Sequence, residues 1–475
     1  MSAERPGSAA ENLALGAAAV LRDNDMGGWT RASEDLYPHQ WSWDTGFIAI
    51  GLAHLNVGRA ARELLGLFEH QWSNGKVPHI VFNPAAPPHS YFPGAEHWSS
   101  AGAFPNAPPA PPYTSALCQP PIHAVAAWLV AQVATGDEDE SVAQKFLREI
   151  YPKLLRWHRY LLTDRDPEGS GLVAIYHPWE SGTDNSPRWD AAMANVEVGE
   201  MLSYKRRDLQ HVEDPEERPT GLEYDRYIWL VESIKNARCD EKLLYETHPF
   251  LVKDVLASAI LVAANEALLE IATMIGAPAS ERGEVRSWIE QGQRGLSGCY
   301  DEVTGLYLDF DLRANQPLRT RTVAGFAPLI SGGLSPERLR SLVALLGSET
   351  FAGHPKLRKS LPPSTSPSAP GFRPRSYWRG PVWPVITWLL WWSLRRSGEA
   401  AAAENLRRVA LDQISEKGFA EYFEPFTGEP LGSQRQSWTA AVALDWLAAE
   451  PPYSPRAQKS PGSLKPGLRV GDDAP

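Results

Sequence analysis

Apolar residues recur at helical spacing along most of this chain. About a dozen segments carry them at positions i, i+3 and i+4, as a helix does when one face packs on a core, and these segments lie near residues 9–22, 45–55, 57–70, 121–134, 139–163, 225–237, 249–276, 280–295, 335–346, 382–397, 399–416 and 437–449. Segment 249–276 is apolar almost all round, which predicts a helix buried on every side. A strand-like piece, Tyr300–Leu312, predicts a small hairpin. The pattern therefore predicts a large all-α domain, although periodicity does not specify how its helices are arranged.

Irregular stretches interrupt the helical pattern. Two of them, near 85–115 and 355–380, contain the proline-rich runs 105–113 and 361–374. Such runs serve either as stiff surface spacers or as lids over a cleft. The last residues, 451–475, are rich in Pro, Gly, Ser and charge and lack periodicity, which predicts a disordered tail. We expect residues 1–450 to form a single domain.

Composition and charge exclude several classes of partner. The chain has 475 residues, of which 43% are apolar and 22% charged, as in ordinary soluble globular proteins. Its net charge of −11 argues against nucleic acid and anionic membranes as partners. The three cysteines, Cys118, Cys239 and Cys299, show no C-x-x-C spacing, and the N-terminus lacks the pattern of a signal peptide. With no apolar stretch near 18 residues, we expect a reduced cytoplasmic protein without a membrane span.

Tryptophan is unusually frequent, with 18 in the chain. Core filling explains any single tryptophan, but several of these stand beside Gly, Pro, Asp or Arg rather than inside aliphatic runs, namely Trp41, Trp43, Trp179, Trp378 and Trp383. Flat rings stack on the C–H faces of sugars and exclude water. The group of tryptophans therefore favours a cleft that binds carbohydrate.

Two acidic segments far apart in the chain set carboxylates among aromatic side chains. They are 179–190 (WESGTDNSPRWD) and 418–428 (GFAEYFEPFTG). An aromatic setting desolvates a carboxyl and allows it to keep its proton near neutral pH. Two carboxyls that face one bond, one as acid and one as base, are the minimal requirement for glycoside hydrolysis.

Each acidic segment offers a principal candidate and an alternative. Asp184 lies in a Gly-Thr-Asp-Asn-Ser-Pro turn, where it could act as a general acid or cap its own loop as an Asx-turn. In the second segment Glu421, if extended, shares a face with two phenylalanines. Glu424 precedes a proline and Glu429 lies in a turn, so both fit surface or structural roles better. Glu421 is therefore the candidate base.

Two further clusters combine aromatic and charged residues. Asp44, in YPHQWSWDTGF, could be the N-cap of the following helix, a ligand for sugar hydroxyls, or the base in place of Glu421. The arginines of RPRSYWRGPVWP (373–384) could pin loops to the scaffold or line a pocket for an acidic group, and Arg218 in RPTGLEYDRYIW has the same ambiguity. The twelve histidines show no H-E-x-x-H motif, and no phosphate loop is present, so neither a metal nor another cofactor is indicated.

Taken together, these motifs resemble glycoside hydrolase family 63, and within it the bacterial glucosylglycerate and mannosylglycerate hydrolases. The resemblance runs through nearly the whole chain, in YPHQWSWDTGFIAIGLAHL, QWSNGKVPHIVF, YFPG, QPPIHA, YHPWESGTDNSPRWD, EYDRYIWL, STSP, RPRSYWRGPVWP and FAEYFEPFTGEPLGSQRQSWTAA. It implies an (α/α)6 toroid with the active site at one mouth and a metal-free, inverting mechanism. By this similarity Asp184 is the general acid and Glu421 the general base.

The resemblance also implies two sets of substrate-binding residues. The sugar pocket would be lined by Tyr37, Trp41, Trp43, Asp44, Tyr91, Gln119, Trp179 and Trp383. The glycerate side would be formed by Arg218, Tyr224, Tyr377, Trp378 and Gln436. The expected partner is a small sugar acid. Rival hypotheses are an inverting α-glycosidase for neutral disaccharides and a non-catalytic toroid that senses solutes. The choice between glucose and mannose, and between a monomer and a homo-oligomer, stays open.

Overall fold

The computed structural model describes residues 8–34, 36–87, 90–201, 203–211 and 214–449, so the predicted tail 451–475 lies outside the described residues. All the helices predicted from periodicity are confirmed: α1 (Ala9–Asp23), α2 (Ser42–Ala53), α3 (Val57–Glu69), α6 (His123–Val133), α7 (Asp137–Thr163), α9 (Gly221–Asn236), α11 (Val255–Ile275), α12 (Ala279–Ser297), α14 (Pro336–Leu346), α15 (Pro384–Arg396), α16 (Ala400–Lys417) and α17 (Ser437–Ala448). Short helices that the periodicity did not predict are α4 (Ala95–Trp98), α5 (Ser100–Ala103), α8 (Asp190–Ala194), α10 (Glu241–Thr247) and α13 (Pro328–Ser331).

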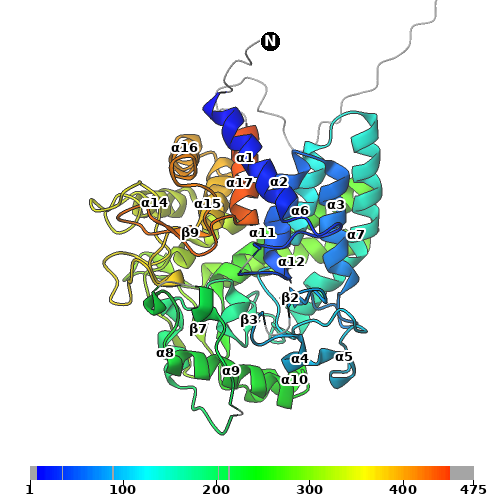
Figure 1. Ribbon diagram of the computed structural model, residues 1–475, viewed down its shortest axis with the longest axis vertical. Coiled ribbons are helices and arrows are strands. Elements are labelled where there is room, and N and C mark those ends of the chain that lie inside the picture. Colours follow the sequence, from blue (N-terminus) through cyan, green and yellow to red (C-terminus); the bar gives the residue numbers. More distant parts are fainter. Residues whose placement is uncertain (1–7, 35, 88–89, 202, 212–213, 450–475) are drawn as a thin grey trace, which may run out of the picture.

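Six of these helices close into an inner ring. Each packs on the next in the order α2, α6, α11, α13, α15, α17, and α17 returns to α2. Outer helices lie against this ring, with α1 on α17, α3 on α2, α7 on α6 and α11, α12 on α11, and α16 on α15. In Figure 1, α8, α9 and α10 lie with β2 (Ile80–Val81), β3 (Ala174–Ile175) and β7 (Phe310–Asp311) in the lower part of the molecule. The closed ring with its outer helices is the (α/α)6 toroid that the sequence resemblance implied.

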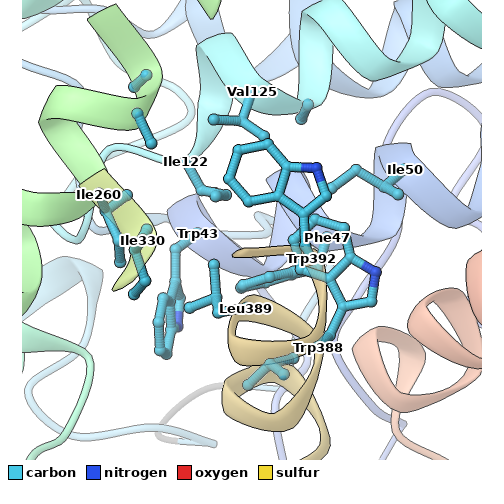
Figure 2. Close-up of a cluster of buried hydrophobic side chains, with 14 of the residues drawn as sticks. Trp43, Phe47, Ile50, Ile122, Val125, Ile260, Ile330, Trp388, Leu389 and Trp392 are labelled. Carbon is cyan, nitrogen blue, oxygen red and sulfur yellow. The ribbon is translucent and has the colours of Figure 1, made fainter. Parts of the chain in front are cut away.

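The axis of the ring is filled with side chains from the inner helices (Figure 2). Phe47 of α2, Ile260 of α11 and Trp388 of α15 are all buried in the same hydrophobic cluster. Every residue of α2 is buried, as expected of a helix with neighbours on all sides. At Gly51 a Cβ atom would lie 2.3 Å from the Cα of Ala441 in α17, so glycine permits the close approach of these two helices.

Helix α11 confirms the prediction of a helix buried on every side. Asp254 caps its N-terminus by accepting hydrogen bonds from the amides of Leu256 and Ala257, and Gly276 ends it in a left-handed conformation. The helix therefore begins later than predicted, because Val252–Lys253 just before the cap forms strand β4. Among the described residues α11 is the one helix long and apolar enough to cross a bilayer, and 83% of its apolar window is buried inside the protein.

Short strands hold the loops at the end of the ring. The sheets are β1 (Gln40–Trp41) with β2 (Ile80–Val81), β5 (Tyr300–Asp301) with β6 (Leu306–Tyr307), β9 (Tyr422–Phe423) with β10 (Pro430–Leu431), and a four-stranded sheet in the order β3 (Ala174–Ile175), β4 (Val252–Lys253), β7 (Phe310–Asp311), β8 (Gln316–Pro317). The predicted hairpin within Tyr300–Leu312 is confirmed for β5 and β6. Its last part is corrected, since Phe310–Asp311 pairs with Val252–Lys253 instead.

Candidate active site

Two connected hollows open among the loops that precede the inner helices. The inner hollow spans about 480 Å³ and the outer hollow about 640 Å³, with the open mouth counted in both. Five residues line both hollows, namely Tyr37, Tyr91, Trp179, Asp184 and Tyr377. Segments that lie far apart in the sequence thus meet around one continuous space.

The structure brings together all but one of the predicted site residues. The inner hollow is lined by Trp41, Trp43, Asp44, Gln119, Trp378, Glu421 and Gln436 besides the shared residues. The outer hollow adds Arg218 and Tyr224. Trp378 and Gln436, which were predicted on the glycerate side, lie in the inner hollow with the residues predicted for the sugar.

Trp383 is the exception, and its predicted place in the sugar pocket is corrected. It does not line either hollow but lies behind Trp378, with ring centroids 3.7 Å apart and ring planes at 3°. Its other face stacks on Tyr422 at 4.5 Å, and it is 1% exposed. Trp383 therefore supports the wall of the hollow from behind.

Glu421 lies at the base of the inner hollow, immediately before β9. Its Oε1 accepts hydrogen bonds from the hydroxyls of Tyr37 at 2.9 Å and Tyr377 at 3.3 Å, and its Oε2 accepts one from the amide of Ser433 at 3.1 Å. Burial raises the pKa of Glu421, and nearby Arg218 and these hydrogen bonds offset part of that effect. The same groups favour the ionised form of the carboxylate and fix its orientation.

The other two glutamates of the second acidic segment have structural roles, as predicted. Glu424 is buried and accepts hydrogen bonds from the amides of Phe426 and Thr427 in a tight turn. Glu429 is exposed and forms an ion pair with Arg375. Glu421 is thus the glutamate of this segment that faces the hollow.

Asp184 faces both hollows from the opposite segment. Burial raises the pKa of Asp184 to about 7, against the lowering effect of Arg218, and Glu421 raises it further. Among the described residues its carboxylate accepts no hydrogen bond from the amide of another residue, so the Asx-turn alternative is not supported. A half-buried carboxyl with a pKa near neutrality has the properties of a general acid.

Asp44 is the third carboxyl at the site. It lies in the first turn of α2, but Trp41 is the N-cap residue and no side chain caps this helix, so the N-cap hypothesis for Asp44 is wrong. Asp44 is 4% exposed, and burial, followed by the charge of Glu421, raises its pKa well above the usual value. A protonated Asp44 can donate as well as accept hydrogen bonds within the inner hollow.

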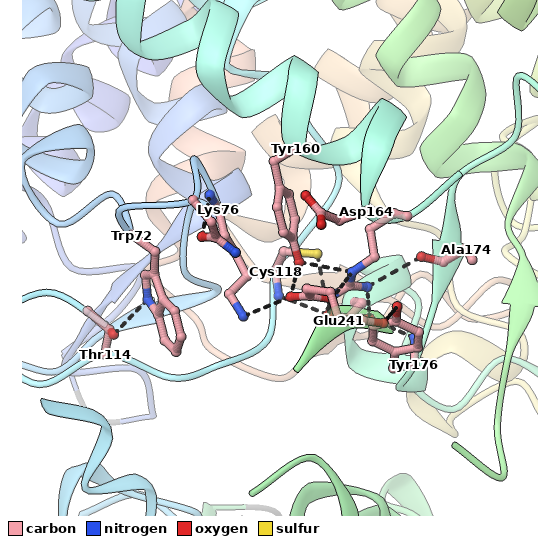
Figure 3. Close-up of polar contacts among 12 residues, drawn as sticks. Trp72, Lys76, Thr114, Cys118, Tyr160, Asp164, Ala174, Tyr176 and Glu241 are labelled. Atoms are coloured by element: carbon pink, nitrogen blue, oxygen red, sulfur yellow. Dashed lines mark hydrogen bonds and ion pairs between the residues drawn. The ribbon is translucent and has the colours of Figure 1, made fainter. Parts of the chain in front are cut away.

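A buried network of ion pairs holds the loop that carries Asp184. Glu180 accepts two hydrogen bonds from Arg165, at 2.8 and 2.9 Å, and further ones from the amides of Cys118 and Tyr176. These bonds lower the pKa of Glu180 to about 2 despite its burial. Arg165 also contacts Glu241, and Figure 3 shows how Lys76, Tyr160 and Tyr176 converge on this centre. Glu180 is therefore the structural carboxylate of the segment, and Asp184 is the one exposed to the hollows.

A second network fixes the other side of this loop. Arg188 donates to Asp254, to Asp309 and, at 2.9 Å, to the hydroxyl of Thr183. Within the same loop Gly182 has a φ of +69°, and a Cβ there would lie 2.8 Å from the ring of Trp43. The backbone around Asp184 is thus held tightly on both sides.

Two arginines of the segment 373–384, Arg375 and Arg379, hold loops together, which is one of the two roles predicted for them. Arg379 pairs with Asp190 and also donates to the carbonyl of Asn185, which joins the loop of Trp378 to that of Asp184. Arg375 contacts Glu429 and Glu217. Neither arginine lines a hollow.

Arg218, in contrast to Arg375 and Arg379, lines the outer hollow and forms no ion pair among the described residues. Its guanidinium lies 4.7 Å over the ring of Tyr377, and the residue as a whole is 8% exposed. Within the described part of the chain its Nε and Nη2 are buried and have no hydrogen-bond partner. Buried donors of a charged group are costly to leave unpaired, so Arg218 is ready to receive an anionic group in the outer hollow.

Sequence reasoning missed several lining residues. In the inner hollow these are His79, Gly182 and Trp438, and in the outer hollow they are Leu36, Ser90, Phe92, Arg207, Asp208, Pro219 and Tyr227. Trp438 lies two positions after the predicted Gln436, so its position was a usable signal. Neither proline-rich run, 105–113 nor 361–374, contributes a lining residue. No group of three potential metal ligands occurs among the described residues.

A helical toroid in which the carboxyls of Asp184 and Glu421 line an aromatic hollow defines a class of protein, the (α/α)6 glycoside hydrolases. The sequence profile described as the mannosylglycerate hydrolase MGH1-like glycoside hydrolase domain matches residues 37–439. The chain belongs to this glycoside hydrolase family.

Named relatives of this family are similar over nearly the full length. The chain is 48% identical to a glucosylglycerate hydrolase of Mycolicibacterium hassiacum, over 92% of this chain and 97% of the relative. It is 40% identical to a mannosylglycerate hydrolase of Thermus thermophilus, over 90% of this chain and 98% of that one. A crystal structure of a GH63 mannosylglycerate hydrolase from Thermus thermophilus, in complex with Tris and D-glycerate, superposes with a TM-score of 0.83 at 39% identity, covering 91% of this chain and 99% of that chain.

Proposed function

We propose that this enzyme hydrolyses the α-glycosidic bond of glucosylglycerate, and also that of mannosylglycerate, with inversion at the anomeric carbon. The products are the free hexose and glycerate. The observation that carries this proposal is the unpartnered guanidinium of Arg218, which faces the outer hollow next to Asp184. A sugar in the inner hollow would direct its small acidic substituent toward this cation.

In the proposed mechanism Asp184 donates its proton to the glyceryl oxygen as the glycosidic bond breaks. Its pKa of about 7 leaves a large fraction protonated near neutral pH, which a general acid requires. Its position on the lining of both hollows agrees with this role, because the bond to be cleaved would join their two occupants.

Glu421 removes a proton from a water molecule on the opposite face of the sugar ring. Its ionised form is stabilised by the hydroxyls of Tyr37 and Tyr377 and by the amide of Ser433. Asp44 is less suited to be the base, because burial and the charge of Glu421 favour its protonated form. Loss of activity in Glu421→Gln, with Asp44 intact, would support this assignment.

Arg218 selects for an acidic aglycone. A hydrogen bond between a guanidinium and a carboxylate contributes about 1.5–3 kcal/mol, or roughly ten- to a hundredfold in affinity. That difference is enough to favour glucosylglycerate over a neutral glucoside of equal size. The relatives named for glucosylglycerate and mannosylglycerate hydrolysis support the same substrate class.

The sugar is held in the inner hollow by stacking and hydrogen bonds. Trp41, Trp43 and Trp378 present rings to the space, and the Oε1 of Gln436 is buried without a hydrogen-bond partner in the described structure. A sugar hydroxyl would satisfy this acceptor. The catalytic unit of the proposal is a single domain, which the family match to residues 37–439 supports, and the free state of all three cysteines agrees with a cytoplasmic location.

A substrate panel tests the proposal. Purified enzyme should release hexose from glucosylglycerate and mannosylglycerate much faster than from trehalose, kojibiose or nigerose. Arg218→Ala should lower kcat/KM for glucosylglycerate by about ten- to a hundredfold and leave the slow hydrolysis of the neutral disaccharides nearly unchanged. Equal loss on all substrates would remove the acid-specific role of Arg218, and faster hydrolysis of a disaccharide would replace the proposed substrate.

A further inference from the structure

Two arginines lie among the charged residues that line the outer hollow. Its charged lining residues are Asp184, Arg207, Asp208 and Arg218. Asp208 is already engaged by the neighbouring Arg206, whose Nε and Nη2 donate to its two carboxylate oxygens at 3.1 and 2.5 Å. Asp184 acts in its protonated form. Among the described residues, neither Arg207 nor Arg218 donates a hydrogen bond to an anionic group.

Arg207 is free among the described residues. It makes no hydrogen bond or ion pair there, whereas Arg206, its neighbour on the chain, is fully occupied by Asp208 and lies 4.4 Å over the ring of Tyr224. Arg207 is half-buried and belongs to the lining of the outer hollow. Its charge thus has no structural use that the contacts reveal.

The segment that carries Arg207 is held in place by other residues. The hydroxyl of Tyr204 donates to Asp225 of α9 at 2.5 Å, and its ring stacks on Phe92 with centroids 5.2 Å apart and planes at 4°. Arg206 adds its contact with Tyr224, which also belongs to α9. These contacts fix the backbone near the mouth of the hollow and leave the Arg207 side chain available for a ligand.

The outer hollow also has room for a second group. It is the larger of the two hollows, at about 640 Å³ against 480 Å³, mouths included. The inner hollow would take a hexose, whereas the outer one would take only a three-carbon acid. A single carboxylate can be bound by Arg218 alone and would leave both space and a cation unused.

We propose that Arg207 and Arg218 together form a subsite for dianionic aglycones, in which Arg218 binds one carboxylate and Arg207 a second anionic group. The inference rests on the proposed function and extends its substrate class to glycosides of hydroxy acids that carry a second carboxylate or a phosphate ester. The charge pair Arg206–Asp208 occupies Asp208, the acidic residue next to Arg207 in the chain.

Competitive inhibition by free acids tests the subsite. D-Glycerate carries one carboxylate, and tartronate is the same skeleton with a second carboxylate in place of its terminal carbinol. We expect tartronate to inhibit glucosylglycerate hydrolysis about tenfold more strongly than glycerate, as one added charged hydrogen-bond partner would give. A ratio of inhibition constants of one or less in the wild-type enzyme would overturn the proposal.

Variants locate the effect on one residue. Arg207→Gln should weaken inhibition by tartronate and leave the inhibition constant of glycerate nearly unchanged, so that the ratio of the two constants approaches one. Arg207→Lys should retain part of the preference for tartronate. Lys205→Gln removes the same charge from an exposed position of the same segment that does not line the hollow, so the ratio should stay at the wild-type value. Equal ratios in the Arg207→Gln and Lys205→Gln enzymes would contradict a specific subsite.

Failure of the two-arginine subsite can be distinguished from failure of the proposed hydrolytic function. If the enzyme does not hydrolyse glucosylglycerate, the inhibition assay gives no signal and the proposed function fails. Titration calorimetry of the wild-type and Arg207→Gln enzymes with tartronate and glycerate then measures the two-arginine subsite directly, with the same expected ratio.

Discussion

Carboxyl groups within one short loop differ sharply in their protonation. Glu180 and Asp184 lie four positions apart, yet the pKa is lowered to about 2 in the first and raised to about 7 in the second. The difference arises because Arg165 and two backbone amides bind the Glu180 carboxylate, while the Asp184 carboxyl is buried with weaker compensation from Arg218. Environment at the scale of single residues thus separates a structural anion from a proton donor.

The first prediction concerns the pH dependence of kcat/KM. Asp184 must be protonated to act, so activity should be present below its pKa of about 7 and fall as the pH rises through that value. Glu421 must be ionised, so activity should also fall on the acid side as the pH drops through its raised pKa. The expected profile is a bell, measured on glucosylglycerate at constant ionic strength. If the alkaline limb of the Asp184→Glu variant coincided with that of the wild-type enzyme at every pH up to 9, Asp184 would not be the general acid.

The second prediction concerns stability. The folded state raises the pKa of Asp184, so this group favours folding in its protonated form and loses that contribution as the pH rises through about 7. Asp184→Asn removes the charge and should raise the melting temperature at pH 8.5 by on the order of 2 °C, with a smaller change at pH 5.5. The same variant should bind substrate without turning it over. A melting temperature that changes equally at both pH values would contradict the raised pKa.

The short loops that carry the site are held by buried polar networks as well as by hydrophobic packing. Loops before α2, α6, α15 and α17 contribute Trp41, Gln119, Trp378 and Gln436 to the inner hollow. Each is fixed to its neighbours by specific bonds, as when the Oδ1 of Asn185 accepts from the amide of Trp378 at 2.8 Å. The inner helices therefore set where the loops begin, and the polar networks set where their side chains lie.

A third prediction tests this at the scale of the element. Glu180→Gln removes the carboxylate that pairs with Arg165, whose side chain is 1% exposed. We expect the free energy of unfolding to fall by about 3 kcal/mol, because the buried charge of Arg165 loses its main partner. Glu429→Gln, at the exposed pair with Arg375, should cost less than about 1 kcal/mol. Chemical denaturation of both variants provides the comparison. Equal effects would show that the buried network does not hold the loop.

The sequence predicted the elements better than their partners. Periodicity located every long helix, since the spacing of apolar residues reports one buried face. It did not reveal that α17 returns to α2, because that contact depends on Gly51 and Ala441, which lie far apart in the sequence. The pairing of Phe310–Asp311 with β4 was missed for the same reason.

The candidate site shows a similar division. Asp184 and Glu421 could be predicted from their aromatic settings, and the structure places both on the hollow. Trp383 was misplaced because its sequence neighbourhood matches that of Trp378, and only the stacking order shows which ring faces the space. Arg207 gave no signal, since its significance depends on Arg206 taking up Asp208.

In the molecule as a whole, a chain with a net charge of −11 contains a hollow whose lining includes two arginines. The ring of inner helices provides the rigid support, with its axis filled by apolar side chains. The loops at one end then surround a space lined by the carboxyls of Asp184 and Glu421 and by the guanidinium of Arg218. We propose that the two carboxyls act on a glycosidic bond from opposite faces.

Proton NMR of the first sugar released from an α-linked substrate tests that claim most directly. Direct attack by water, activated by Glu421 while Asp184 protonates the leaving oxygen, gives the β-anomer of the hexose before mutarotation mixes the two forms. The β-anomer should therefore appear first and decay toward equilibrium. Initial release of the α-anomer would indicate a covalent intermediate and would contradict the assigned roles of residues 184 and 421.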